Sequence, residues 1–142
     1  MCAACGADLG FDPGGFPEKW GATMSGFSKR VLIALGAGAL LGVFCIFGVG
    51  LRVGFDGNGG FLFSIWYNRL LMGLVIGLAG GVTLLKSGKA NIVARGLLLG
   101  ALVSLASSLS TDFRDVPSFF AGIVYGPIID AVASWLSERP RA

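Results

Sequence analysis

The chain has 142 residues, the length of a single domain, and 54% of them are hydrophobic whereas only 13% are charged. Soluble domains carry about a quarter charged residues and rarely place glycine in helices, so this composition, with its 24 glycines, argues against a soluble protein and for an integral membrane protein. The sequence has no histidine, which excludes a histidine-based triad or a histidine-ligated metal within one chain, and its net charge of +3 is spread around the apolar runs instead of forming a nucleic-acid-binding patch.

The N-terminus reads MCAACGADLG, in which Cys2 and Cys5 have the C-x-x-C spacing. The run at 2–9 resembles a zinc-ribbon knuckle, in which a glycine turn aims two thiolates at one metal. Structural zinc takes four ligands, and a second knuckle is missing from the sequence. Metal binding would therefore need a second chain, a partner protein or weak donors such as Asp8 and Asp12. The missing knuckle favours an inert pair of thiols, and a zinc ion shared between chains is the alternative that the resemblance implies. We expect 1–28 to form a cytoplasmic N-terminal segment, with no certain cofactor.

Four apolar segments have the length of about 20 residues that a helix needs to cross a membrane. The second reaches that length only if the aromatic stretch 61–68 forms its outer end. This places Arg69 within the helix, where we expect its long side chain to extend to the membrane surface. The four-helix membrane domain is then 29–137, followed by a short tail at 138–142. The expected spans are about 31–51, 61–86, 92–111 and 116–136.

Lysine and arginine residues are unevenly divided between the two ends of these spans. Eight lie on the side of the termini, and three lie on the other side. The positive-inside rule therefore places both termini in the cytoplasm. The eight are Lys19, Lys29, Arg30, Lys86, Lys89, Arg95, Arg139 and Arg141, and the three are Arg52, Arg69 and Arg114.

Glycine residues recur every four positions in each span, so each helix carries a groove of small side chains on one face. In lipid such grooves allow close backbone contact between helices. We therefore expect an all-α bundle of four transmembrane helices that packs tightly through these grooves, with a pore or binding function for the grooves as the alternative. The packing glycines are Gly38, Gly42, Gly73, Gly77, Gly81, Gly96, Gly100, Gly122 and Gly126.

Asp130 continues the ladder of the fourth span, so its carboxylate is predicted to face the bundle interior. Arg95, near the start of the third span, is the best candidate partner, and the alternatives are Lys29, Arg30 and Lys86. Pro127 predicts a kink beside it, because proline cannot donate a backbone hydrogen bond. Three interpretations stay open: a structural ion pair, a cation or proton site in a transport path, and a water-facing residue in a vestibule.

A second polar feature is a stripe of hydroxyl side chains on the third span, formed by Ser104, Ser107, Ser108 and Thr111. Hydroxyl groups in membranes bond to a neighbouring helix or to a preceding carbonyl of their own helix. The stripe is therefore interpreted as a helix contact, with a water path toward Asp130 as the alternative.

These features do not predict an enzyme, because no nucleophile and base are spaced as a catalytic pair. Two hypotheses follow. The chain is a structural, accessory or assembly subunit in the lipid bilayer, packed as a homo-oligomer or in a larger membrane complex. Alternatively, it is a small oligomeric transporter or channel that uses Asp130 and the hydroxyl stripe.

Overall fold

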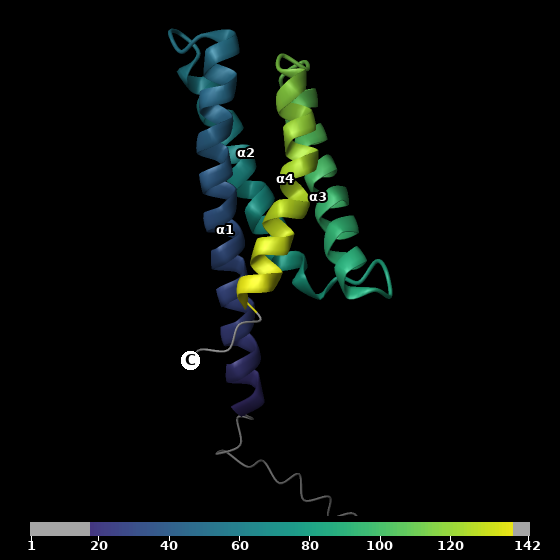
Figure 1. Cartoon of the computed structure of the whole chain (residues 1–142). Helices are drawn as coiled ribbons and strands as arrows, with labels where there is room; N and C mark the ends of the chain where they lie inside the picture. The colour runs from purple at the N-terminus through teal and green to yellow at the C-terminus, as the bar shows by residue number, and fades with distance from the viewer. Residues whose placement is uncertain (1–17, 138–142) are drawn as a thin grey trace, which may run out of the picture.

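The structure, a computed structural model, describes residues 18–137 and their side chains from residue 26 onward. The predicted zinc knuckle with Cys2 and Cys5 and the expected tail at 138–142 lie outside these residues. The described chain is all-α (Figure 1). Its elements are α1 (Glu18–Val53), α2 (Gly59–Leu78), the 3-10 turn η1 (Ala79–Gly81), α3 (Gly88–Ser110) and α4 (Val116–Ser137).

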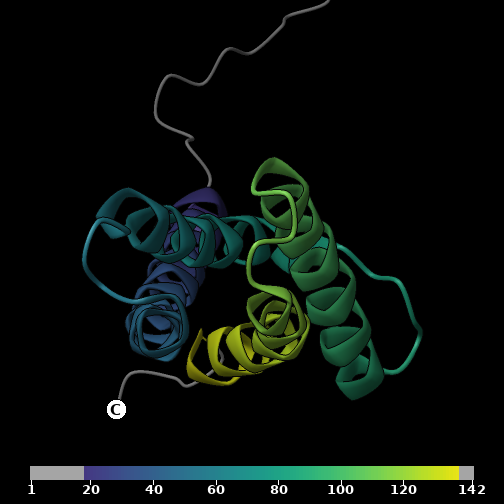
Figure 2. The ribbon, with the colours of Figure 1, turned by 90° about the horizontal axis from the view of Figure 1, so that it is seen from above.

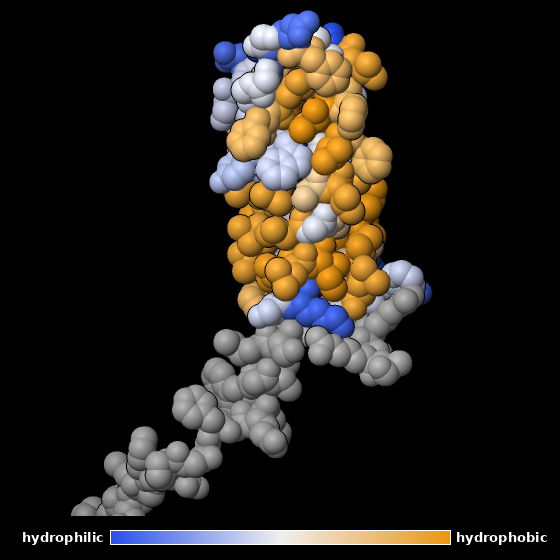
Figure 3. All heavy atoms as spheres, turned by 90° about the vertical axis from the view of Figure 1, so that its left-hand side faces the viewer, coloured by the Kyte–Doolittle hydropathy of each residue, from blue (hydrophilic) through white to orange (hydrophobic). Residues whose placement is uncertain are grey.

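Each of the four helices contains a segment that is long and apolar enough to cross a membrane. Hydrophobic residues cover the middle of the molecule, and hydrophilic residues gather toward its two ends (Figure 3). Large apolar side chains such as Leu40, Phe44 and Phe47 point outward from α1. Exposure of such side chains to water is unfavourable, whereas contact with lipid chains is not. The described chain therefore has the architecture of a four-span membrane protein. The spanning segments are Gly26–Val53, Gly59–Gly81, Gly88–Ser110 and Val116–Ser137.

The helices form two antiparallel hairpins, α1 with α2 and α3 with α4, and each hairpin is packed more closely than the hairpins are with each other. Helix α4 lies between α1 and α3, as the view from above shows (Figure 2). The hairpins meet mainly through α1 and α4, whereas the contact between α2 and α3 is slighter.

The glycine grooves explain the close packing within each hairpin. A Cβ atom added at Gly38 would lie 2.5 Å from the carbonyl oxygen of Arg69 and 3.2 Å from the Cα of Gly73. In the other hairpin, a Cβ added at Gly100 would lie 2.8 Å from the carbonyl oxygen of Gly122. These backbones approach so closely because no side chain stands between them. The same holds at the contacts made by Gly73, Gly77, Gly96 and Gly126, whereas Gly42 and Gly122 make room for side chains, those of Trp66 and Ser104.

Two expectations about the second span are wrong. The helix was expected to continue to residue 86, but α2 ends at Leu78, a 3-10 turn follows, and Val82 is extended. Consecutive glycines destabilise the helix at this point, and the carbonyl oxygens freed at Gly80 and Val82 accept hydrogen bonds from an arginine of α3 instead. Gly81 therefore leaves the packing ladder: a Cβ there would meet nothing within 4 Å.

The turn that joins α1 and α2 lies at the opposite end of the bundle. The α1–α2 turn contains Gly54 (φ 83°) and Gly57 (φ 75°), which adopt the left-handed conformation at no steric cost. The Asn58 side chain bridges this turn by donating to the carbonyl oxygen of Val53 at 3.0 Å.

Helix α1 begins at Glu18, well before the expected start at residue 31. Helix α4 continues through Pro127, and the kink there stays a prediction.

Candidate functional site

Asp130 lies at the centre of a buried ion-pair cluster at the end of the bundle where α1 enters and α4 leaves. The residue is completely buried. Its Oδ2 accepts a hydrogen bond from Nε of Arg95 at 2.8 Å, and its Oδ1 accepts one from Nη2 of Arg95 at 2.9 Å. Nη2 of Arg30 also donates to Oδ1. We call these three residues the Asp130 cluster; one carboxylate in it faces two guanidinium groups.

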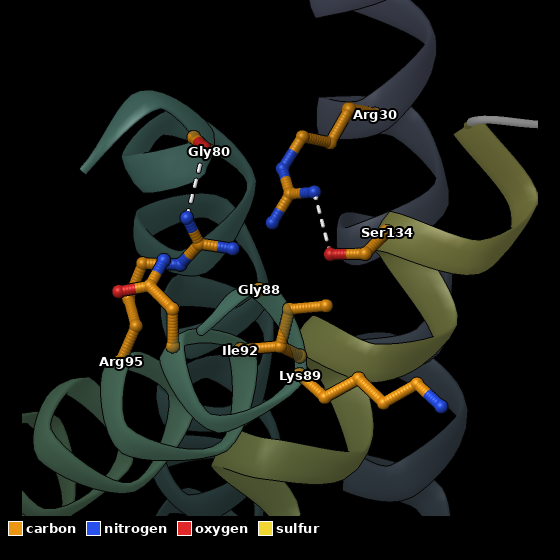
Figure 4. Close-up of a pocket in the computed structure, with 8 residues that line it drawn as sticks. Arg30, Gly80, Gly88, Lys89, Ile92, Arg95 and Ser134 are labelled. Atoms are coloured by element: carbon orange, nitrogen blue, oxygen red, sulfur yellow. Dashed lines mark hydrogen bonds between the residues drawn. The ribbon is translucent and has the colours of Figure 1, made fainter. Parts of the chain in front are cut away.

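Both arginines have further partners that join the cluster to the rest of the bundle. Nη1 of Arg95 donates to the carbonyl oxygens of Gly80 and Val82, at 2.8 and 3.0 Å. Nη1 of Arg30 donates to Oγ of Ser134 at 2.9 Å. Figure 4 shows Arg30 and Arg95 approaching from opposite sides of this region. The cluster therefore ties together α1, η1 with the segment after it, α3 and α4.

The four-residue ladders place these side chains. Asp130 and Ser134 continue the ladder of Gly126 on α4, and all three are buried. Arg95 lies on the buried face of α3, where sequence reasoning expected it. Arg30 was ranked only as an alternative partner, although it lies four residues before the buried Ala34 and so extends the α1 ladder by one step. That spacing is the signal that could have identified it.

A cavity of about 380 Å³ adjoins the cluster. Arg30, Arg95, Ser134 and Lys89 are among the residues that line it, and the exposed side chain of Lys89 extends away from the two guanidinium groups (Figure 4). Asn91, also at the wall, accepts from the backbone N–H of Leu85 at 3.0 Å and donates to the carbonyl of Val82 at 3.2 Å. The segment between η1 and α3 is therefore fixed beside a cavity with a positive lining.

Arg69 forms a second polar centre inside the bundle. It was expected to extend to the membrane surface, but it is 1% exposed, so that expectation is wrong. Nη1 donates to Oγ of Ser104 and Nη2 to Oγ of Ser118, both at 3.0 Å, and Nη2 also donates to the carbonyl of Ser118. The guanidinium lies 5.6 Å from the ring centre of Tyr125, and the absent side chain of Gly122 leaves it room. Polar partners inside the bundle thus replace those at the surface.

The hydroxyl stripe of α3 divides between different partners. Ser104 and Ser108 are buried, and Ser104 contacts Arg69. Thr111 donates to the carbonyl of Ser107 in its own helix at 3.1 Å. Ser107 itself lines a shallow cavity of about 260 Å³ together with residues of α2. These contacts therefore favour the helix-contact interpretation at Ser104 and a local backbone contact at Thr111.

The opposite end of the bundle carries an exposed ion pair with similar geometry. Nε and Nη2 of Arg52 donate to the two carboxylate oxygens of Asp115, at 3.1 and 2.8 Å. The Arg52 side chain is 45% exposed, in contrast to 4% for Arg95. This pair joins α1 to the start of α4 and is a natural reference for the buried cluster.

Within residues 18–137, no group of three or more histidine, cysteine, aspartate and glutamate side chains is arranged to hold a metal ion. Cys45 is a buried free thiol whose Sγ lies 3.5 Å from Oγ of Ser118. Zinc binding by Cys2 and Cys5 stays a prediction, because both lie outside this range.

Comparisons of the chain with protein-family models, with curated protein sequences and with solved structures find no match.

Proposed function

We propose that this chain is a structural or accessory membrane protein, a subunit that packs with copies of itself or within a larger membrane complex. The observation that carries the proposal is the environment of Asp130, which is completely buried and accepts hydrogen bonds from guanidinium groups at both oxygens. Charge-assisted bonds of this kind fix side chains in one arrangement. The carboxylate therefore serves to hold helices together.

The same environment argues against Asp130 as a binding site for a transported cation. A cation at the carboxylate would have to displace Arg30 or Arg95, and it would then face two neighbouring positive charges. Like charges at such distances repel strongly in a medium of low dielectric constant.

The test is to reconstitute the protein in liposomes and to measure proton and potassium flux. The expected result for the natural chain is no flux above that of empty liposomes, and mild-detergent purification with native mass spectrometry is expected to detect several copies or co-purifying subunits. Flux that Asp130→Asn abolishes while the variant keeps its helical content at the temperature of the flux assay would overturn the proposal. Asp115→Asn is the matched control, because it changes the exposed pair at the other end.

A second candidate function is that of a small oligomeric transporter or channel, and the observation in its favour is Arg69. Its guanidinium is buried among hydroxyl groups, and no described carboxylate forms a salt bridge with it. A buried positive charge of this kind attracts anions. The same liposomes loaded with chloride distinguish the two functions, because a transporter predicts chloride flux that Arg69→Met removes and Arg52→Gln preserves.

The proposed orientation has both termini in the cytoplasm. Arg30, Lys89 and Arg95 lie together at the end of the bundle that the positive-inside rule assigns to this side. Reporter domains fused to the two ends of the chain test the orientation. Reporters active on opposite sides of the membrane, or both active outside, would contradict it.

A further inference from the structure

The cavity beside the Asp130 cluster carries an excess of positive charge that the function proposed above does not use. Asp130 neutralises one of the two guanidinium groups that bind it, and no other described carboxylate forms a salt bridge with either arginine. Lys89, which also lines the cavity, adds a third positive charge. An anion in the cavity would offset the charge that remains.

Arg30 has hydrogen-bonding capacity directed at this cavity. Of the five N–H donors that a guanidinium carries, the described contacts use two, one to Asp130 and one to Ser134. Its Nε is buried against Gly80, so the capacity that remains is on the terminal nitrogens Nη1 and Nη2, each of which uses one of its two N–H groups. The side chain lines the cavity and is 12% exposed, so an acceptor atom in the cavity would find N–H groups that no described residue uses.

Helix α3 contributes a second, independent feature. The helix begins at Gly88 on the cavity wall, and its N-cap residue, Ser87, makes no side-chain capping hydrogen bond. The first N–H groups of a helix have no partner within the helix, and the helix dipole adds partial positive charge there. Phosphate groups bind at such helix starts.

The position of the cavity selects the kind of anion. Arg95 lies seven residues into α3, about 10 Å from its start, and Ser134 lies within the last turn of α4. The cavity is therefore at the level where these spans leave the hydrocarbon core, which is where lipid phosphates lie. Leu84 and Leu85 beside it are 45% and 49% exposed, so apolar surface for an acyl chain adjoins the charged lining.

We propose that this cavity binds the phosphate group of an anionic phospholipid, with Arg30, Lys89 and Ser134 as the contacting side chains. Guanidinium and ammonium groups bind phosphate oxygens strongly, and a basic pocket between spans at the cytoplasmic surface suits an anionic headgroup. A volume of about 380 Å³ accommodates a phosphoglycerol headgroup. The site is independent of whether the chain is an accessory subunit or a transporter.

The test measures the thermal midpoint of the purified protein in mild detergent while short-chain phosphatidylglycerol, short-chain phosphatidylcholine or inorganic phosphate is added. Phosphatidylglycerol is expected to raise the midpoint in a saturable manner, and phosphatidylcholine is expected to have little effect. Lys89→Gln is expected to weaken the apparent affinity for phosphatidylglycerol about fivefold. Lys86→Gln is the matched control, because Lys86 is an exposed lysine of the loop just before α3 that does not line this cavity.

Three results would overturn the proposal. Equal stabilisation by both lipids would remove the role of the anionic headgroup. Equal weakening by Lys89→Gln and Lys86→Gln would reduce the effect to general surface charge. Stabilisation by inorganic phosphate at the concentration that suffices for phosphatidylglycerol would assign the site to free phosphate instead of a lipid. Neither lysine belongs to the Asp130 cluster, so both variants are expected to fold.

Discussion

Asp130→Asn isolates the contribution of the buried cluster, because within the described part of the chain Asp130 carries the only carboxylate that pairs with Arg30 and Arg95. Asparagine keeps the size of the side chain and one acceptor oxygen, so the change creates little empty space. The side-chain amide of asparagine, however, carries N–H donors in place of one acceptor oxygen, and these would face the N–H donors of the two arginines. Arg30 and Arg95 would then lie side by side without a counter-charge, since both donate to the same oxygen, Oδ1.

The expected cost follows from this geometry. Two guanidinium groups that share one oxygen have charge centres about 5 Å apart, and their repulsion is roughly 3 kcal/mol at an effective dielectric constant of about 20. Removal of one partner from a buried ion pair costs about 3–5 kcal/mol. The estimated repulsion between the arginines therefore agrees with the cost expected when a buried ion pair loses one partner. For a chain of this size, such a loss corresponds to a thermal midpoint lower by roughly 10–20 °C.

Asp115→Asn makes the same chemical change in the exposed pair at the other end of the bundle. The Arg52 side chain there is 45% exposed and that of Asp115 is 6% exposed, so water reaches this pair from the arginine side, and its loss is expected to cost less than that of the buried cluster. Both variants are compared with the natural chain by thermal unfolding in mild detergent, followed by circular dichroism. Arg95→Gln is expected to be milder than Asp130→Asn, because Arg30 still neutralises the carboxylate. Equal shifts for Asp130→Asn and Asp115→Asn would refute the reasoning.

Three further changes test the packing, the second polar centre and the loop beside the cavity. Gly126→Ala is expected to lower the thermal midpoint by several degrees because the new Cβ would overlap the backbone of α3, whereas Gly36→Ala, with nothing within 4 Å, is expected to leave it unchanged or raise it slightly. Arg69→Lys is expected to cost about 1–3 kcal/mol in the same unfolding assay, because one ammonium group cannot reproduce a planar guanidinium that bridges two serine side chains; an unchanged midpoint would contradict this. Asn91→Ala is expected to accelerate tryptic cleavage after Lys86, because its side chain holds the backbone of that loop, and an unchanged cleavage rate would show that the loop is held by other contacts.

The number and the approximate positions of the helices could be predicted from the sequence, because uninterrupted apolar runs have few other structures available in lipid. The end of the second span could not. Hydropathy remains high through Val82 to Leu85, so composition gives no reason to end the helix at Leu78. What ends it is the combination of the Gly80–Gly81 pair and the hydrogen bonds of Arg95 in α3 to the freed carbonyls of Gly80 and Val82, a contact between residues far apart in the sequence.

The candidate site was partly accessible to the same reasoning. A four-residue spacing placed Asp130 on the interior face of α4, and matching membrane depth selected Arg95 as its nearest cation. Depth alone did not separate Arg30 from its neighbour Lys29. The missing step was to extend the α1 ladder backward from Ala34, which assigns Arg30 to the buried face and Lys29 to another.

The burial of Arg69 changes how the basic residues report on orientation. The positive-inside rule counts charges that must stay in water near the ends of the spans. Arg69 is buried among serine hydroxyls, so it does not belong to the outer count, and Asp130 offsets one of the two charges of Arg30 and Arg95. Seven of the eight positive charges then remain on the side of the termini and two of the three on the other side. The interior arginines therefore do not weaken the predicted orientation, because the ratio of the remaining charges is larger than that of the full set.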